Sequence, residues 1–330
     1  MAAPRDGRLE AAVLRIDPEA ESSRIAAWMR EAVRDTFRRR GLVIALSGGV
    51  DSSVCAMLAV RALGAGRVFG LMMPERDSSP ESRIRAEEVA RRLGIESTVE
   101  DIAPALEALG CYARRDEAIR RLVPEYGDGW RSKIAIAGGR EGTFNYFKLV
   151  VRSPAGEDRE LRMPLAEYLG VVAATNFKQR VRKTLEYYHA DRLNYAVVGT
   201  PNRLEYDQGF FVKNGDGAAD LKPIAHLYKT QVYSLARHLG VPDEICEAAP
   251  TTDTYSLQQG QDEFYFALRY DRMDLALWAF NHGLPADGVA DALGISLREA
   301  EFVYADIAAK RRATRYLHAA PLMVEPVALP

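Results

Sequence analysis

Residues 42–54 read LVIALSGGVDSSV and join an apolar run, a glycine loop and the beginning of a helical pattern. Leu42 to Leu46 is short and continuously apolar, which is typical of a buried strand. Val54 to Leu63 has helical periodicity, and Gly64 follows at the point where a helix would end. The stretch therefore predicts a strand, a loop and a helix in direct succession.

The same alternation continues along the chain. Strand-like apolar runs occur at Val68 to Met73, Ile95 to Val99 and Tyr195 to Val198. Alternating strands and helices of this kind predict an α/β fold, with a doubly wound parallel sheet covered by helices. The helical patterns that we expect around these strands cover Glu21 to Arg40, Ser82 to Leu93, Asn176 to Arg192, Pro223 to Leu239 and Asp271 to Leu317.

Three parts are predicted from these patterns: an N-terminal helix in residues 1–40, an α/β core in 41–250, and a C-terminal helical region and tail in 251–330 that completes the same domain. Residues 111–163 interrupt the alternation. Within them, Phe144 to Ser153 and Arg159 to Met163 resemble two strands, so the sequence predicts a β-hairpin insertion.

Composition excludes several classes of protein. Hydrophobic residues make up 48% of the 330 residues and charged residues 27%, with a formal net charge of -2, which is ordinary for a soluble globular protein. The absence of a long basic block argues against nucleic-acid binding, and the absence of a run of about 18 apolar residues argues against a membrane span. Three widely spaced cysteines without Cys-x-x-Cys pairs predict a reducing, cytoplasmic location and no zinc site.

The glycine loop carries the first chemical signal. Gly48 and Gly49 allow the backbone to approach a ligand closely, and the helix N-terminus after Val50 favours an anion such as a phosphate. Ser47 and Ser52 can donate hydroxyl hydrogen bonds to phosphate oxygens, and the Asp51 carboxylate can hold Mg²⁺. The loop lacks the Gly-Lys-Ser/Thr ending of a Walker-type phosphate loop.

SGGVDSS after an apolar strand resembles the loop of the PP-loop ATP pyrophosphatases, which have an adenine nucleotide alpha hydrolase-like fold and cleave ATP to AMP and pyrophosphate. A second block narrows the resemblance, because residues 199–242, GTPNRLEYDQGFFVKNGDGAADLKPIAHLYKTQVYSLARHLGVP, look like the signature of the NH3-dependent NAD synthetase family. The blocks NFKQRVR at 176–182, APTT at 249–252 and KRR at 310–312 follow the order of that family. The resemblance covers about two thirds of the chain.

The resemblance implies roles for individual residues. Asp51 and Lys229 would be catalytic, and Asp51 and Glu205 would hold Mg²⁺. It also implies a homodimer that uses ATP, ammonia and nicotinic acid adenine dinucleotide (deamido-NAD). The ATP-binding residues would be Ser47, Gly48, Gly49, Val50, Asp51, Ser52, Thr200, Lys229 and Thr251, and those binding deamido-NAD would be Arg180, Lys213, Asp220 and Lys310.

Two other functions stay open. Pro201, Ala309 and the insertion depart from the family pattern on the substrate side, so the enzyme could amidate another carboxylate such as a sugar acid. The Leu284 to Val303 helix pair could instead belong to a nucleotide-sensing DNA-binding protein, but its second helix is acidic and apolar where base-reading side chains would be needed.

The source of ammonia and the role of the insertion complete the expectations. No cysteine lies in a glutaminase context, so ammonia would come free or from a separate glutaminase. Residues 111–163 follow the third strand, near the sheet edge where doubly wound folds bind ligands. We therefore expect the insertion to shape or cover the pocket for the acid.

Overall fold

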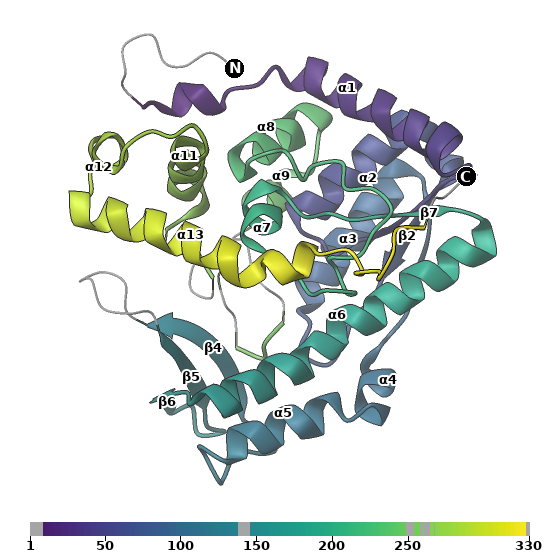
Figure 1. Ribbon diagram of the computed structural model, residues 1–330. Coiled ribbons are helices and arrows are strands. Elements are labelled where there is room, and N and C mark those ends of the chain that lie inside the picture. Colours follow the sequence, from purple (N-terminus) through teal and green to yellow (C-terminus); the bar gives the residue numbers. More distant parts are fainter. Residues whose placement is uncertain are drawn as a thin grey trace.

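A four-stranded parallel sheet lies at the centre of the computed structural model, which describes residues 9–137, 146–248, 254–257, 260, 265–266 and 268–327 (Figure 1). The strand order is β3-β2-β1-β7. Leu42 of β1 pairs with Val68 of β2 on one side and with Ala196 of β7 on the other. The strands are β1 (Leu42–Ala45), β2 (Val68–Met72), β3 (Glu96–Val99) and β7 (Ala196–Val198).

Helices cover both faces of this sheet, as the doubly wound prediction requires. On one face Leu42 and Ile44 pack with α1 (Pro18–Glu31), α2 (Val50–Leu63), α3 (Pro80–Leu93) and α8 (Lys229–Leu239). On the other face Val43 and Leu71 belong to apolar clusters completed by α6 (Leu165–Leu193), α4 (Ala103–Ala108) and α5 (Cys111–Arg120). Because side chains alternate along a strand, continuous apolar runs fill both cores.

Two helices begin elsewhere than the sequence predicts. The α6 helix begins at Leu165 instead of Asn176, because Val171 and Ala174 are buried against α5 and the insertion although Gly170 weakens the helical pattern. The α8 helix begins at Lys229 instead of Pro223, and residues 223–226 form a turn. The first difference arises from contacts with distant segments, whereas the start of α8 also has a local capping box between Tyr228 and Gln231.

The predicted hairpin is present as β5 (Tyr146–Arg152) and β6 (Asp158–Arg162), and a further strand, β4 (Arg131–Ala137), extends it to a three-stranded antiparallel sheet within the insertion. The strand order is β4-β5-β6, and Ile134 of β4 pairs with Leu149 of β5. The first strand reads RSKIAIA, in which serine and alanine weaken the β signal. Buried Ile134 and Leu149 pack with Ile119 of α5, which ties the sheet to the rest of the chain.

The C-terminal region is helical, as predicted. Its helices are α11 (Tyr270–Asn281), α12 (Ala286–Leu293) and α13 (Leu297–His318), and their shared core includes Trp278 and Ile307. The shorter helices α7 (Arg203–Gln208) and α9 (Asp243–Cys246), the 3-10 turns Ala11–Leu14 and Ala65–Arg67, and the π-helical turn Ala32–Thr36 complete the described elements.

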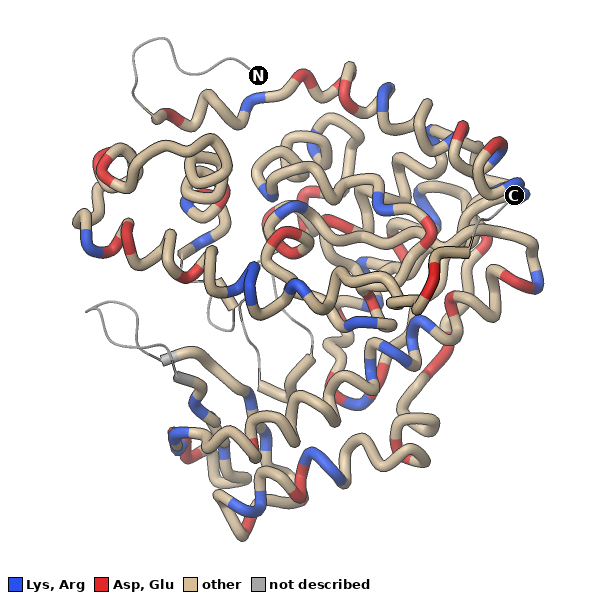
Figure 2. The backbone as a smooth tube through the Cα atoms, in the orientation of Figure 1, with Lys and Arg blue, Asp and Glu red and all other residues tan. Residues whose placement is uncertain are grey.

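Acidic and basic residues intermix along the outer helices in Figure 2, in keeping with the nearly balanced composition. In the described part of the chain, no helix is long and apolar enough to cross a bilayer. The division into residues 1–40, 41–250 and 251–330 stays a prediction.

Candidate active site

The loop between β1 and α2 has the backbone geometry of an anion cradle. Gly48 has a φ of +77°, and a Cβ at this position would lie 2.1 Å from the carbonyl oxygen of Ser82. Only glycine fits there without strain. The Ser52 hydroxyl donates to the Gly49 carbonyl at 3.0 Å and accepts from the Ser47 N–H at 3.3 Å. The loop therefore leads into the N-terminus of α2, where helical N–H groups are available to a ligand.

A cavity of about 760 Å³ opens beside this loop, at the carboxyl ends of β1, β2 and β7. Its size suits a nucleotide-sized ligand. The α6 helix lines it along several turns, the end of α13 closes another side, and residues 209–213 form part of the wall. This is the edge at which doubly wound sheets bind ligands.

Asp51 and Lys229 form an ion pair inside the cavity. The Lys229 ammonium donates to Asp51 Oδ2, and the Asn202 side-chain amide donates to Asp51 Oδ1 at 3.2 Å. Only 3% of the Lys229 side chain is exposed, against 17% for Asp51. Burial alone would lower the pKa of Lys229, but the carboxylates of Asp51 and Glu205 outweigh it and raise that pKa, so the lysine is charged at neutral pH.

Glu205 reaches the same cavity through a helix cap. Its Oε2 accepts from the Asn202 backbone N–H at 3.1 Å, while its own N–H donates to Asn202 Oδ1 at 3.3 Å. This reciprocal pair is the capping box that begins α7. Asn202 thus fixes both carboxylates, Asp51 through its side chain and Glu205 through the cap.

A buried carboxylate that the sequence analysis missed holds the helix that carries Lys229. The two oxygens of Asp274, on α11, accept from the Lys229 N–H at 3.1 Å and the Thr230 N–H at 2.6 Å. Burial raises the pKa of Asp274 to about 7, against the opposing effect of these amide hydrogen bonds. No local pattern could reveal this contact, because Asp274 lies 45 residues after Lys229.

The structure brings the residues expected at ATP and at the metal together. All of them except one line this single cavity: Ser47, Gly48, Gly49, Val50, Asp51, Ser52, Thr200, Glu205 and Lys229. Thr251 lies outside the described residues. Their roles toward ATP and Mg²⁺ stay predictions.

Of the residues expected at the acid substrate, two line the cavity. The Arg180 Nε donates to the Lys213 carbonyl at 3.3 Å, and the Lys213 ammonium donates to the carbonyls of Tyr316 at 2.9 Å and Ala319 at 3.1 Å. Lys213 therefore already contacts the segment at the end of α13.

The other two do not line the cavity in the described structure. Asp220 accepts from the Val197 N–H at 2.7 Å and from the Tyr187 hydroxyl at 3.3 Å. Lys310 donates to Asp306 at 2.6 Å and to the carbonyl of Tyr265, a cavity residue, at 2.5 Å. Contact of Asp220 or Lys310 with substrate stays a prediction.

Aromatic side chains of the cavity were also missed. Phe147, from the inserted sheet, stacks on Tyr168 of α6 with ring centroids 4.0 Å apart, and both line the cavity with Tyr255. The sequence holds no motif around Phe147 that would have placed it here. Lys183 and Glu186, a cavity-lining pair with an Nζ–Oε2 distance of 2.7 Å, could have been found by extending helical spacing from Arg180.

The family model for NAD synthase matches residues 21–123 and 162–315. The chain belongs to the NAD synthase family. The NH3-dependent NAD synthetase of Rhizobium meliloti (strain 1021) is 61% identical over 98% of both chains, and that of Thermotoga maritima is 37% identical over 77% of this chain and 84% of the relative. The family model passes over residues 124–161, whereas the alignment with the Rhizobium meliloti relative spans 327 residues. The inserted sheet is therefore an addition to the common NAD synthase pattern.

Solved structures agree on the fold. The structure of NMN synthetase from Francisella tularensis superposes with a TM-score of 0.64 at 24% identity, covering 94% of this chain and 99% of that one. The NH3-dependent NAD synthetase from Campylobacter jejuni gives a TM-score of 0.62 at 21% identity, covering 94% and 100%. Both confirm the α/β fold of the NAD synthase family.

Proposed function

We propose that this chain is an NH3-dependent NAD synthetase, which uses ATP to convert the nicotinate carboxylate of deamido-NAD into the carboxamide of NAD⁺. The relatives that are 61% and 56% identical over nearly their whole length bear the name of this activity. The observation that carries the proposal is the ion pair of Asp51 and Lys229 beside the glycine loop, within the cavity that Glu205 also lines.

The residues that line the cavity suggest how the two steps of the reaction proceed. With the triphosphate on residues 47–52, the substrate carboxylate attacks the α-phosphorus, an acyl-adenylate forms and pyrophosphate leaves. The Lys229 charge stabilises the negative charge that develops on pyrophosphate. Ammonia then attacks the acyl carbon, AMP leaves and one proton is released. The walls hold the reactants in place, so positioning and charge stabilisation supply most of the catalysis.

The residues present fit a magnesium ion. Asp51 and Glu205 both offer carboxylate oxygens to the cavity, and Mg²⁺ in nucleotide sites is held by one or two carboxylates together with substrate phosphates. Among the described residues no group of three or more His, Cys, Asp or Glu side chains could hold a metal, so phosphate oxygens and water would complete the coordination. When bound, the ion would neutralise charge on the pyrophosphate.

One assay tests the activity and the identity of the acid. Purified protein with ATP, Mg²⁺, ammonium and deamido-NAD should form NAD⁺, AMP and pyrophosphate in equal amounts. Formation of ADP and phosphate would contradict adenylation. Parallel reactions with nicotinic acid mononucleotide and a panel of sugar acids provide the comparison, and faster turnover of a sugar acid would favour the alternative amide ligase.

We further propose that the inserted sheet forms part of the acid pocket, through the half-buried ring of Phe147 stacked on Tyr168. Replacing Phe147 with alanine should raise KM for deamido-NAD about tenfold, the loss expected for one aromatic contact, and leave the ATP affinity unchanged. Steady-state kinetics and calorimetry with ATP measure the two effects.

Leu161→Ala is the matched control for Phe147→Ala. Leu161 packs in the same inserted sheet but is not among the described residues that line the cavity. It reports any general loosening of the sheet. An unchanged KM for deamido-NAD in folded Phe147→Ala, or an equal rise in the control, would remove the insertion from the acid pocket.

The remaining proposals concern the oligomeric state of the protein and the source of ammonia. We propose a homodimer, supported by Leu165 and Leu169, which lie one turn apart on α6 with 72% and 53% of their surface exposed. Ammonia would come free or from a separate glutaminase in the cytoplasm. Sedimentation of the purified protein tests the dimer, and glutamine in place of ammonium in the assay tests the ammonia source.

A further inference from the structure

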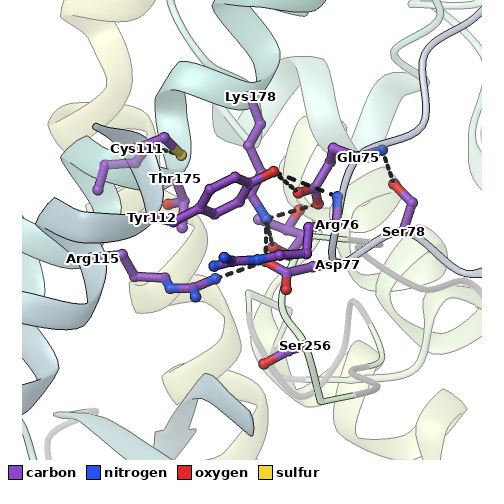
Figure 3. Close-up of polar contacts among 12 residues, drawn as sticks. Glu75, Arg76, Asp77, Ser78, Cys111, Tyr112, Arg115, Thr175, Lys178 and Ser256 are labelled. Carbon is purple, nitrogen blue, oxygen red and sulfur yellow. Dashed lines mark hydrogen bonds and ion pairs between the residues drawn. The ribbon is translucent and has the colours of Figure 1, made fainter. Parts of the chain in front are cut away.

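Lys178, on α6, is a buried lysine that makes three hydrogen bonds. Its ammonium donates to Glu75 Oε1 and Asp77 Oδ2 (Figure 3). It also donates to the Thr254 carbonyl oxygen, and each of the three distances is 2.8 Å. Only 1% of its side chain is exposed. All three donors of the ammonium are thus used, and none of them is directed to solvent.

The two carboxylates have further partners on α5. Arg115 donates to Asp77 Oδ2 at 2.7 Å, and the Tyr112 hydroxyl donates to Glu75 Oε2 at 2.8 Å (Figure 3). Burial opposes ionisation of Asp77, but Lys178 and Arg115 outweigh it and lower the pKa of that carboxyl. The cluster therefore balances two buried carboxylates against two buried cations.

The segments that Lys178 joins are walls of the cavity. Glu75 and Asp77 belong to residues 74–79, which follow β2 and line the cavity with Pro74, Ser78 and Ser79. Thr254 and Tyr255 line it as well. Lys178 does not line the cavity among the described residues, so it can affect a ligand only through these walls.

The segment 254–257 is also fixed from its other side. The Ser256 hydroxyl accepts from the Ser132 N–H of β4 at 2.9 Å, and the Leu257 N–H donates to the Ser132 carbonyl at 3.2 Å. This segment is therefore held between the inserted sheet and Lys178. Among the described residues, the Lys178 ammonium contacts both this segment and residues 74–79.

These walls adjoin the glycine loop, at which the proposed function places ATP. Strand β2 is the direct neighbour of β1, with Ala45 paired to Leu71, so residues 74–79 leave the sheet next to the glycine loop. The loop touches the next helix, because a Cβ on Gly48 would lie 2.1 Å from the Ser82 carbonyl oxygen. A nucleotide bound at the glycine loop would therefore lie next to the segment that Lys178 holds.

We propose that Lys178 is a positioning residue for ATP, which sets the separation of segments 74–79 and 254–257 across the nucleotide site. This inference rests on the proposed function, which identifies the bound nucleotide as ATP. Neither the NAD synthase model nor the names of the relatives assign a role to this lysine.

Two variants separate positioning from simple stability. Lys178→Met leaves Glu75 and Asp77 short of a cation in a buried site, and should lower Tm by about 10 °C. The double variant Lys178→Met/Glu75→Gln removes one charge of each sign and keeps the Arg115–Asp77 pair, so most of the lost Tm should return. The hydrogen bonds of the ammonium to both walls are absent in either variant.

The test is the ATP dissociation constant, measured by calorimetry well below Tm. Both variants should bind ATP at least about tenfold more weakly than the parent, and kcat at saturating ATP should change less than KM for ATP. His189→Gln removes the contact of a buried histidine with the partly exposed Glu100, outside the described cavity lining; it is the matched control and should bind ATP normally.

Recovery of ATP affinity together with Tm in the double variant would overturn the proposal, because Lys178 would then serve stability alone. The same holds if ATP affinity is unchanged in the single variant. If Lys178→Met fails to fold, the double variant alone decides. Failure of the parent to form NAD⁺ would contradict the proposed function and leave the ATP binding result intact.

Discussion

Replacing Asp51 with asparagine should lower kcat at least about 10³-fold, because the variant loses the glycine-loop carboxylate that we propose holds Mg²⁺. Steady-state formation of NAD⁺ over a wide range of Mg²⁺ concentrations measures the loss. Glu205→Ala should change the rate in the same direction, since Glu205 lines the same cavity. Near-normal turnover of either variant at saturating Mg²⁺ would contradict its place at the metal.

The Asp51 variant should also be less stable than the parent. The Asp51 carboxylate pairs with the Lys229 ammonium, whose side chain is only 3% exposed, and an asparagine would leave that buried charge without its ion-pair partner. A fall in Tm is therefore expected alongside the loss of activity, and a change at this residue is not neutral for the fold. The rate must be measured at a temperature where circular dichroism shows the variant folded.

Replacing Lys229 with methionine should lower kcat by about 10²- to 10³-fold, because it removes the charge that we propose stabilises the departing pyrophosphate, and no other described residue forms an ion pair with Asp51. Its Tm should fall less than that of Asp51→Asn. The carboxylate left behind has 17% of its side chain exposed toward the cavity, where water can solvate it, whereas the ammonium is almost fully enclosed.

Lys148→Met controls for the loss of a positive charge away from the cavity, since Lys148 pairs with Glu160 at the surface of the inserted sheet. It should keep both kcat and Tm close to the parent values. Activity of Lys229→Met within tenfold of the parent would remove Lys229 from the catalytic step. A larger fall in Tm for Lys229→Met than for Asp51→Asn would contradict the expectation that the unpaired ammonium destabilises the protein more than the unpaired carboxylate.

The sheet could be predicted because its strands are continuous apolar runs next to turn residues, so the information lies within a few consecutive positions. Residues 165–175 and 223–228 were assigned wrongly for the opposite reason. The first segment is helical because it packs on α5 and the insertion, and the second leads to a helix whose start is fixed by Asp274. Neither contact is local in sequence.

The residues of the candidate site also fall into those that local motifs predict and those that long-range contacts place. The glycine loop, Glu205 and Lys229 stand in ordered motifs, and the structure gathers them around one cavity. Phe147 and Asp274 contribute through contacts across the fold, from an insertion and from a later helix. Lys178 stands in the NFKQRVR block, but its contacts with Glu75 and Thr254 join segments that are far apart in the sequence. A single sequence contains these residues but gives no spacing that connects them to the loop.

Lys178 and Lys229 both contact residues that the ribosome adds much later in synthesis. Thr254 follows Lys178 by 76 residues and Asp274 follows Lys229 by 45, while the glycine loop is among the first segments to emerge. Domains fold from the N-terminal side during synthesis, so the sheet can form early around an unfinished nucleotide site. A nascent or prematurely terminated chain ending before Thr254 would carry the glycine loop without the Thr254 contact of Lys178 and the Asp274 contact of Lys229. Such chains would be poor consumers of ATP, and translation itself would delay activity until the last quarter of the protein has been made.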